Sequence, residues 1–136
     1  MTKHIFIQIL LNLLLLNLTF SEKQKEFICI TKYINNIKNV HDEFKFLTDF
    51  HKCIMEKEKN KNLFDYVKVL HKYGIEYEEK SMKNVDVSEL GAETVLALIL
   101  GIMRADHFSE GTLKQFIDNG YIYKWLKRLK EIDDSI

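Results

Sequence analysis

The segment that most constrains the fold of this chain is residues 94–104, because it is apolar on every side. A helix with one apolar stripe lies on a surface, whereas a helix that is apolar all round must be buried. Residues 86–132 as a whole indicate three helices, with a polar hinge at residues 105–111 and a turn at Asn119 and Gly120. We therefore expect residues 90–103 to form a central buried helix.

Composition favours a single all-α domain. The chain has 136 residues, the size of one domain, and its hydrophobic fraction of 46% suits one core. Proline is absent and the five glycines stand singly, so the chain lacks the turn-forming residues that would separate many short strands. The charges of twenty basic and twenty acidic side chains cancel, so no net charge attracts the protein to nucleic acid or to an anionic membrane. The periodicity predicts a compact bundle of about six or seven short helices.

Residues 1–21 are an apolar segment that has two interpretations. A basic start, an apolar middle and the small residues Thr19 and Ser21 are typical of a secretory signal peptide. Alternatively, His4, Gln8, Asn12 and Thr19 share one narrow face of a retained helix, which packs on the domain or is an exposed anchor.

The same segment bears on location and partners. Its apolar run of residues 5–20 contains three amides and is shorter than the ~20 residues that cross a bilayer. If it is retained but unpacked, its leucines favour association with lipid or with a second copy, hence a homodimer. We expect a cytoplasmic protein with a single helical domain at residues 22–136, or a secreted one if residues 1–21 are a signal.

Amphipathic patterns predict further helices before the buried one. They begin near Glu26, His41 and Leu63, and the last of them ends at Gly74. Asp86 and Glu89 resemble a capping box at the start of the buried helix. The predicted core comprises Phe27, Ile34, Phe44, Phe50, Leu70, Leu96, Ile99, Phe108, Leu113, Ile117, Leu126 and Leu129.

The hinge carries the motif Arg104-Ala-Asp-His-Phe-Ser-Glu-Gly111. With the helices around it, this motif resembles the bacterial family catalogued as domain of unknown function 6508 (DUF6508), over about residues 63–131. Members share an Arg-x-Asp/Glu-Arg-Phe-x-Glu/Asp-Gly segment, so His107 stands where the pattern usually has arginine. The resemblance implies a fold and a cytoplasmic origin, but no activity.

The hinge residues Arg104, Asp106, His107 and Glu110 are one candidate binding site, and they also fit a second interpretation. They are either a ligand or partner site, or two helix caps and an ion pair at a corner that Phe108 anchors in the core. In the corner interpretation, Ser109 is the natural cap of the second helix.

Catalytic and metal signatures are missing from the sequence. It contains neither a nucleophile with a neighbouring base nor a glycine-rich phosphate loop, so we expect a protein that is not an enzyme. Cys29 and Cys53 lie in apolar helical patterns, where a free cysteine behaves as a small hydrophobe. We expect neither a metal nor a cofactor.

The remaining hypothesis is a protein-binding module, and a mobile-element-encoded regulator or inhibitor of a host system is typical of such small helical proteins. The alternative is a helix-turn-helix protein whose last helix, residues 121–132, binds nucleic acid. The last-helix candidates, whose aromatic members suit a protein interface and whose basic members suit phosphates, are Tyr121, Tyr123, Lys124, Lys127 and Arg128.

Overall fold

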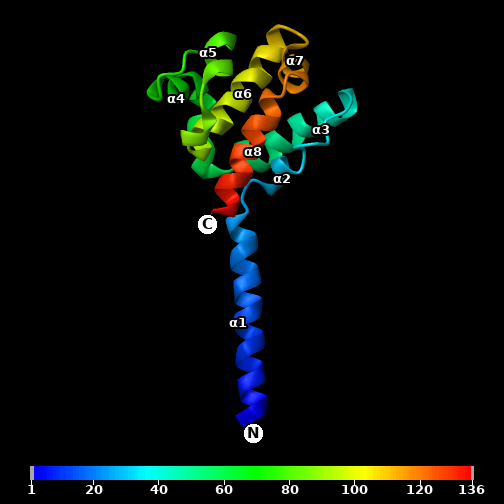
Figure 1. Ribbon diagram of the computed structural model, residues 1–136, viewed down its shortest axis with the longest axis vertical. Coiled ribbons are helices and arrows are strands. Elements are labelled where there is room, and N and C mark those ends of the chain that lie inside the picture. The colour runs from blue at the N-terminus through cyan, green and yellow to red at the C-terminus, as the bar shows by residue number, and fades with distance from the viewer. Residues whose placement is uncertain (1, 136) are drawn as a thin grey trace.

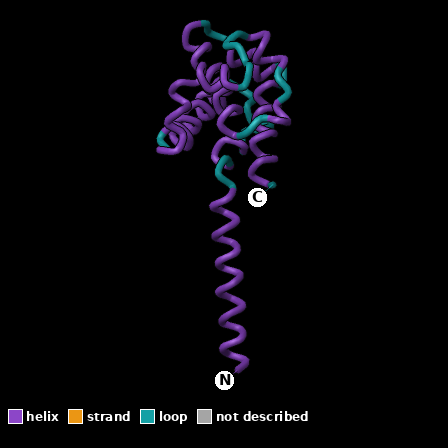
Figure 2. Tube along the Cα trace, turned by 90° about the vertical axis from the view of Figure 1, so that its left-hand side faces the viewer, coloured by secondary structure: helices purple, strands orange, loops and turns teal. Residues whose placement is uncertain are grey.

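The computed structural model describes residues 2–135, and the side chains of residues 3–15 and 25–135. Over this range the protein is all-α, as predicted, with a compact helical domain from which one long helix projects (Figures 1 and 2). In chain order the helices are α1 (Thr2–Gln24), α2 (Ile28–Thr31), α3 (Val40–Phe50), the π-helical turn η1 (His51–Met55), the 3-10 helix η2 (Glu58–Asp65), α4 (Tyr66–Lys72), α5 (Glu79–Asn84), the 3-10 turn η3 (Val87–Glu89), α6 (Ala92–Phe108), α7 (Thr112–Asp118) and α8 (Tyr121–Asp134).

The predicted central helix is α6. Its residues 94–103 are all buried, and α4, α7, α8 and η2 pack around it. Gly101 lets an aromatic side chain come close, because a methyl group at this position would lie 3.1 Å from Cε1 of Tyr77. The hydroxyl of Tyr77 donates a hydrogen bond of 2.8 Å to the carbonyl oxygen of Gly101.

The turns on either side of α7 use glycine in the left-handed region. Gly111 precedes α7 with φ of 97°, and Gly120 precedes α8 with φ of 84°. Phe116 on α7 packs its ring 5.8 Å from that of Trp125 on α8. The three predicted helices and the turn at Gly120 are therefore confirmed, and so is the end of the preceding helical segment at Gly74, where φ is 75°.

The predicted capping box is wrong. The side chain of Asp86 accepts a hydrogen bond of 3.0 Å from the amide of Ser88, which caps η3 rather than α6. Within η3, the amide of Leu90 donates a hydrogen bond to the carbonyl oxygen of Val87, which completes the 3-10 turn. Leu90 is extended, and α6 starts at Ala92 after Gly91.

Most of the predicted core is buried, but two aromatic predictions are wrong. Phe44 is 66% exposed and Phe108 is 87% exposed. On α3 the interior position belongs to Phe46, two residues away and hence on the opposite side of the helix. Phe108 is the last residue of α6, beyond the helices that cover the middle of α6. Ile34 and Ile117 are half-buried against the core.

The long helix α1 does not pack on the domain in the part where side chains are described. Its apolar side chains from Ile5 to Leu15 are exposed on every side, and Gln8 donates a hydrogen bond of 3.2 Å to Asn12. The side chains of Thr19 and Ser21 lie outside the described part. No helix among the described residues is long and apolar enough to cross a membrane.

Candidate functional site

The predicted hinge is shorter than expected, because α6 continues to Phe108. Arg104, Asp106 and His107 therefore lie on the last turns of a helix, and Glu110 lies in the short link to α7. Arg104 and His107 are exposed and three residues apart, so they share one face of α6.

Asp106 holds the corner between α6 and α7. Its Oδ1 accepts hydrogen bonds from the amides of Gly111, at 3.1 Å, and Leu113, at 3.0 Å. It therefore satisfies amides at the start of α7, a task predicted for Ser109. Instead, the carbonyl oxygen of Ser109 accepts a hydrogen bond of 2.8 Å from the hydroxyl of Thr112. Asp106 is thus structural, and the predicted Ser109 cap is wrong.

Arg104 and His107 border a hollow between α6 and the neighbouring helix α3. We call this hollow the α3–α6 groove; its volume is about 240 Å³. The lining residues are Leu47, His51, Met103, Arg104, Asp106 and His107.

Two exposed aromatic side chains flank the α3–α6 groove. Phe44 lies one turn before Leu47 on α3, on the same face as the groove-lining Leu47 and His51. On α6, the ring of Phe108 meets the ring of His107 edge-on, with 5.1 Å between centroids. The arrangement places an aromatic ring on each helix beside a shallow depression that Arg104 helps to line.

The half-buried carboxyl of Glu43 on α3 lies near charged side chains of α6 and α7. Burial is the main cause that raises the pKa of Glu43 above its ordinary value. Lys114 opposes the shift, whereas the carboxylates of Asp106 and Asp118 add to it. The carboxyl groups of Glu43, Asp106 and Asp118 and the ammonium group of Lys114 therefore lie near one another at this corner.

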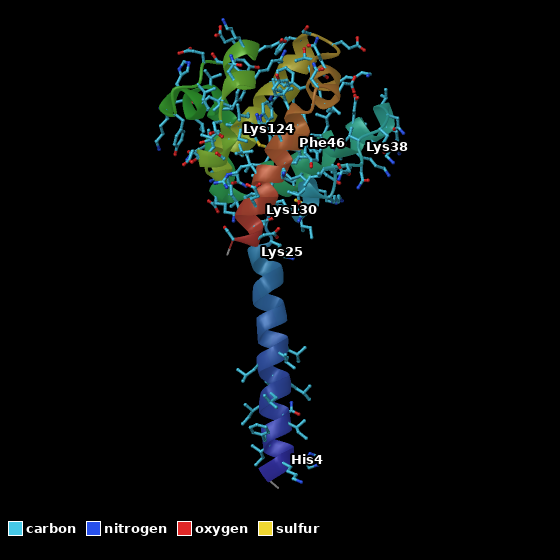
Figure 3. The ribbon with its side chains drawn as sticks, in the orientation of Figure 1. His4, Lys25, Lys38, Phe46, Lys124 and Lys130 are labelled. Carbon is cyan, nitrogen blue, oxygen red and sulfur yellow. The ribbon has the colours of Figure 1, made fainter. Side chains whose placement is uncertain are left out.

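The last-helix candidates divide into structural and exposed residues. Nε of Arg128 donates a hydrogen bond of 2.9 Å to the carbonyl of Leu90, which ties α8 to the start of α6. Tyr121 is half-buried, with its ring 5.5 Å from that of Phe116. The exposed members are Tyr123, Lys124, which is labelled in Figure 3, and Lys127.

Sequence reasoning missed Leu47 and His51 as site residues and placed Phe44 in the core. The available signal was the spacing of Phe46, Phe50 and Ile54, four residues apart and all fully buried. That stripe, once recognised as the interior of α3 and η1, leaves residues 44, 47 and 51 on another face.

Other parts of the described surface offer no convergent set of side chains. A hollow of about 590 Å³ beside α4 is lined mostly by charged and polar groups. Its residues are Asn62, Asp65, Lys68, Val69, His71, Lys72 and Glu93. Within residues 2–135, no three His, Cys, Asp or Glu side chains lie close enough together to hold a metal ion.

The fold and the groove define a small all-α domain with a shallow surface site. The chain belongs to the family of unknown function DUF6508, whose model matches residues 37–135, and this confirms the resemblance seen in the sequence. The matched part runs from just before α3 to the end of α8, and α1 and α2 precede it. No curated protein and no solved structure matches the chain.

Proposed function

We propose that this protein is a non-enzymatic protein-binding module whose partner docks at the α3–α6 groove. The observation that carries the proposal is the pair of exposed aromatic side chains, Phe44 and Phe108, beside a hollow with Arg104 in its wall. Aromatic and arginine side chains concentrate binding energy at protein interfaces. The volume of about 240 Å³ lies below the ~300–1,000 Å³ usual for ligand pockets and suits single side chains of a partner.

The charges at the groove indicate the chemistry of that partner. The carboxylate of Asp106 is engaged by two backbone amides. Among the described residues, no salt bridge involves Arg104. A partner carboxylate would therefore give Arg104 a charge-assisted hydrogen bond, while an apolar side chain enters the groove.

The biological setting that we propose is regulation or inhibition of a host system by a bacterial protein acting in the cytoplasm. Small size and a surface groove without a catalytic arrangement support that role. A secreted protein remains the alternative if residues 1–21 serve as a signal peptide.

Affinity capture from the host lysate, with and without nuclease, tests the proposal. We expect the tagged full-length chain to recover one stoichiometric protein partner that survives nuclease. The double variant Phe44→Ala, Phe108→Ala should lose it, as should Arg104→Ala. The matched control is Phe64→Ala, which removes another exposed phenylalanine, on η2. Retention of the partner by both groove variants would contradict the proposal.

Nucleic-acid binding by α8 is the alternative. It draws on the exposed Lys124 and Lys127, since Arg128 is engaged with Leu90. Two phosphate contacts correspond to a slope of about −2 in a plot of log affinity against log salt concentration. Recovery that vanishes with nuclease, and that Lys124→Ala weakens, would favour this alternative.

A further inference from the structure

The long helix α1 exposes apolar side chains on all of its sides as it projects from the domain (Figure 3). Nine large apolar residues between Ile5 and Leu15 are exposed, from 46% for Leu10 to 64% for Phe6, so no side of this stretch is shielded. At about 100° per residue, their positions point all round the helix axis. A helix that is apolar all round is buried in native proteins, either in a protein core or in a membrane. The described part of α1 therefore needs surroundings that the domain does not supply.

Two amide side chains interrupt this apolar surface, and they pair with each other. Gln8 donates a hydrogen bond of 3.2 Å to Asn12, one turn further along the helix. A polar side chain in hydrocarbon needs a hydrogen-bond partner from the protein, because no water is available there. The pairing of Gln8 with Asn12 therefore lowers the cost of placing α1 in an apolar environment.

The charge of residues 1–21 favours an anionic surface. They contain Lys3 and His4 but neither aspartate nor glutamate, and the first acidic residue is Glu22. The complete chain, by contrast, has equal numbers of acidic and basic side chains. A lysine near the end of an apolar helix extends its ammonium group to anionic lipid headgroups while its methylene chain stays in the apolar region. The lipid that best fits α1 is therefore an anionic one.

A lipid bilayer covers this surface more completely than a second copy of the chain does. When two helices pair, they contact each other along one stripe, which leaves the remaining sides exposed. Hydrocarbon surrounds a helix and covers every side. Without lipid, association among copies is the remaining way to reduce the exposed apolar area, so self-association in water and insertion into lipid depend on the same side chains.

The length of α1 and its attachment suit an anchor at one membrane surface. At 1.5 Å per residue, the apolar run of residues 5–20 measures about 24 Å, less than the ~30 Å hydrocarbon core of a bilayer. The base of α1 is fixed to the domain, because the carboxylate of Asp133 on α8 accepts hydrogen bonds from the amides of Glu26, at 3.0 Å, and Phe27, at 2.9 Å. Glu26 also forms an ion pair with Lys59 on η2. Immersion of α1 would therefore hold the domain beside the lipid.

We propose that α1 inserts into the hydrocarbon of an anionic lipid bilayer without crossing it, and that it anchors the helical domain at the membrane surface. The apolar side chains between Ile5 and Leu15 supply the affinity, and Lys3 contacts anionic headgroups. The domain stays in water, with its charged side chains solvated. The anchor uses no residue of the α3–α6 groove, so a failure of either proposal leaves the other standing.

Flotation of the full-length protein with vesicles tests the proposal. Protein, phosphatidylcholine and phosphatidylglycerol are mixed in a mild detergent, which is then removed, so that oligomers formed in water do not block insertion. In a density gradient we expect the protein to float with the vesicles and to stay with them in high salt. Leu11→Gln, Leu14→Gln should lower the partition coefficient about a hundredfold or more, because two immersed leucine side chains are lost. The matched control is Val40→Gln, Phe64→Gln, which replaces two exposed apolar side chains of the domain and should float like wild type.

A tryptophan placed in α1 separates insertion from adsorption to the surface. Trp125, the only tryptophan of the chain, is buried in the domain, so the wild-type protein is the control. In Leu10→Trp the added indole lies in the middle of the described apolar stretch. We expect phospholipids that carry bromine in their acyl chains to quench the fluorescence of this indole and to leave that of Trp125 unchanged.

Three results would overturn the proposal. They are a full-length protein that stays at the bottom of the gradient as a soluble oligomer, flotation that high salt abolishes, and equal flotation of the wild type and the Leu11→Gln, Leu14→Gln variant. Flotation of Leu10→Trp without quenching would show adsorption of the chain to the surface and would overturn insertion. Equal partition into vesicles of phosphatidylcholine alone would overturn the preference for anionic lipid.

Discussion

Asp106 and Phe108 lie two residues apart at the end of α6, and helix geometry separates their directions by about 200°. Asp106 points to the start of α7, where two amides donate to its carboxylate. Phe108 points to solvent and meets only the edge of His107 among the aromatic rings near it. The sequence-based corner model gave the anchoring role to Phe108, whereas the structure gives it to Asp106.

Replacing Asp106 by alanine should therefore destabilise the fold. The substitution leaves the amides of Gly111 and Leu113 without their acceptor, which costs about 1–2 kcal/mol for a lost helix cap. Urea unfolding of the full-length chain measures the change. The neighbouring Glu110→Ala is the control and should stay within about 0.5 kcal/mol of wild type, as is usual for an exposed position. Equal effects of the two substitutions would contradict the capping role.

A pair of phenylalanine substitutions tests the burial assignments. Phe108→Ala should change the free energy of unfolding by less than about 0.5 kcal/mol, because the ring is 87% exposed. Phe116→Ala should cost about 3–5 kcal/mol, because that ring is fully buried beside Trp125. The two proteins can be compared by thermal and urea unfolding. A large loss in Phe108→Ala would restore the buried-anchor interpretation.

At the scale of elements, helices with a clear 3.6-residue period were predictable, and their junctions were not. Residues 94–103 are apolar on every side, so their burial in α6 followed from composition alone. The extension of α6 to Phe108 did not follow, because the apolar pattern ends at Met103 and polar residues continue the helix. The cap at Asp86 was assigned to the wrong helix, because a capping residue in the sequence does not show which helix follows it. In the structure it caps η3, not α6.

The burial of Glu43 on α3 should make the stability of the fold depend on pH. Its pKa is raised in the folded protein, so its contribution is fully present below the unfolded pKa and is lost as pH rises through the folded pKa. Glu43→Gln removes that loss, so we expect the variant to be more stable than the wild type at pH 7. The gap between variant and wild type should close below about pH 4. Urea unfolding at several pH values measures it, and a gap that widens in acid would contradict the assignment.

At the scale of the whole molecule, only one wall of the α3–α6 groove could be predicted from the sequence. Arg104 and His107 stand out in the sequence, yet the other wall of the groove comes from Leu47 and His51, more than fifty residues earlier. No local period links the two walls, which lie far apart in the sequence and line one hollow only in the folded chain. Sequence reasoning therefore predicted the wall on α6. It assigned Phe44, which lies beside the wall on α3, to the core, although Phe44 is exposed.

The exposed apolar side chains of α1 should determine the oligomeric state of the full-length chain. Nine large apolar side chains between Ile5 and Leu15 are each about half exposed, an apolar surface larger than single domains usually leave open. We expect the full-length chain to elute as an oligomer in size-exclusion chromatography with light scattering, whereas a chain lacking residues 1–21 elutes as a folded monomer. Because the described part of α1 does not pack on the domain, Tm should differ little between the two chains. The full-length variant Leu11→Gln, Leu14→Gln separates apolarity from length, and it should shift toward monomer. A monomeric wild-type chain would show that exposed leucines of α1 do not drive self-association.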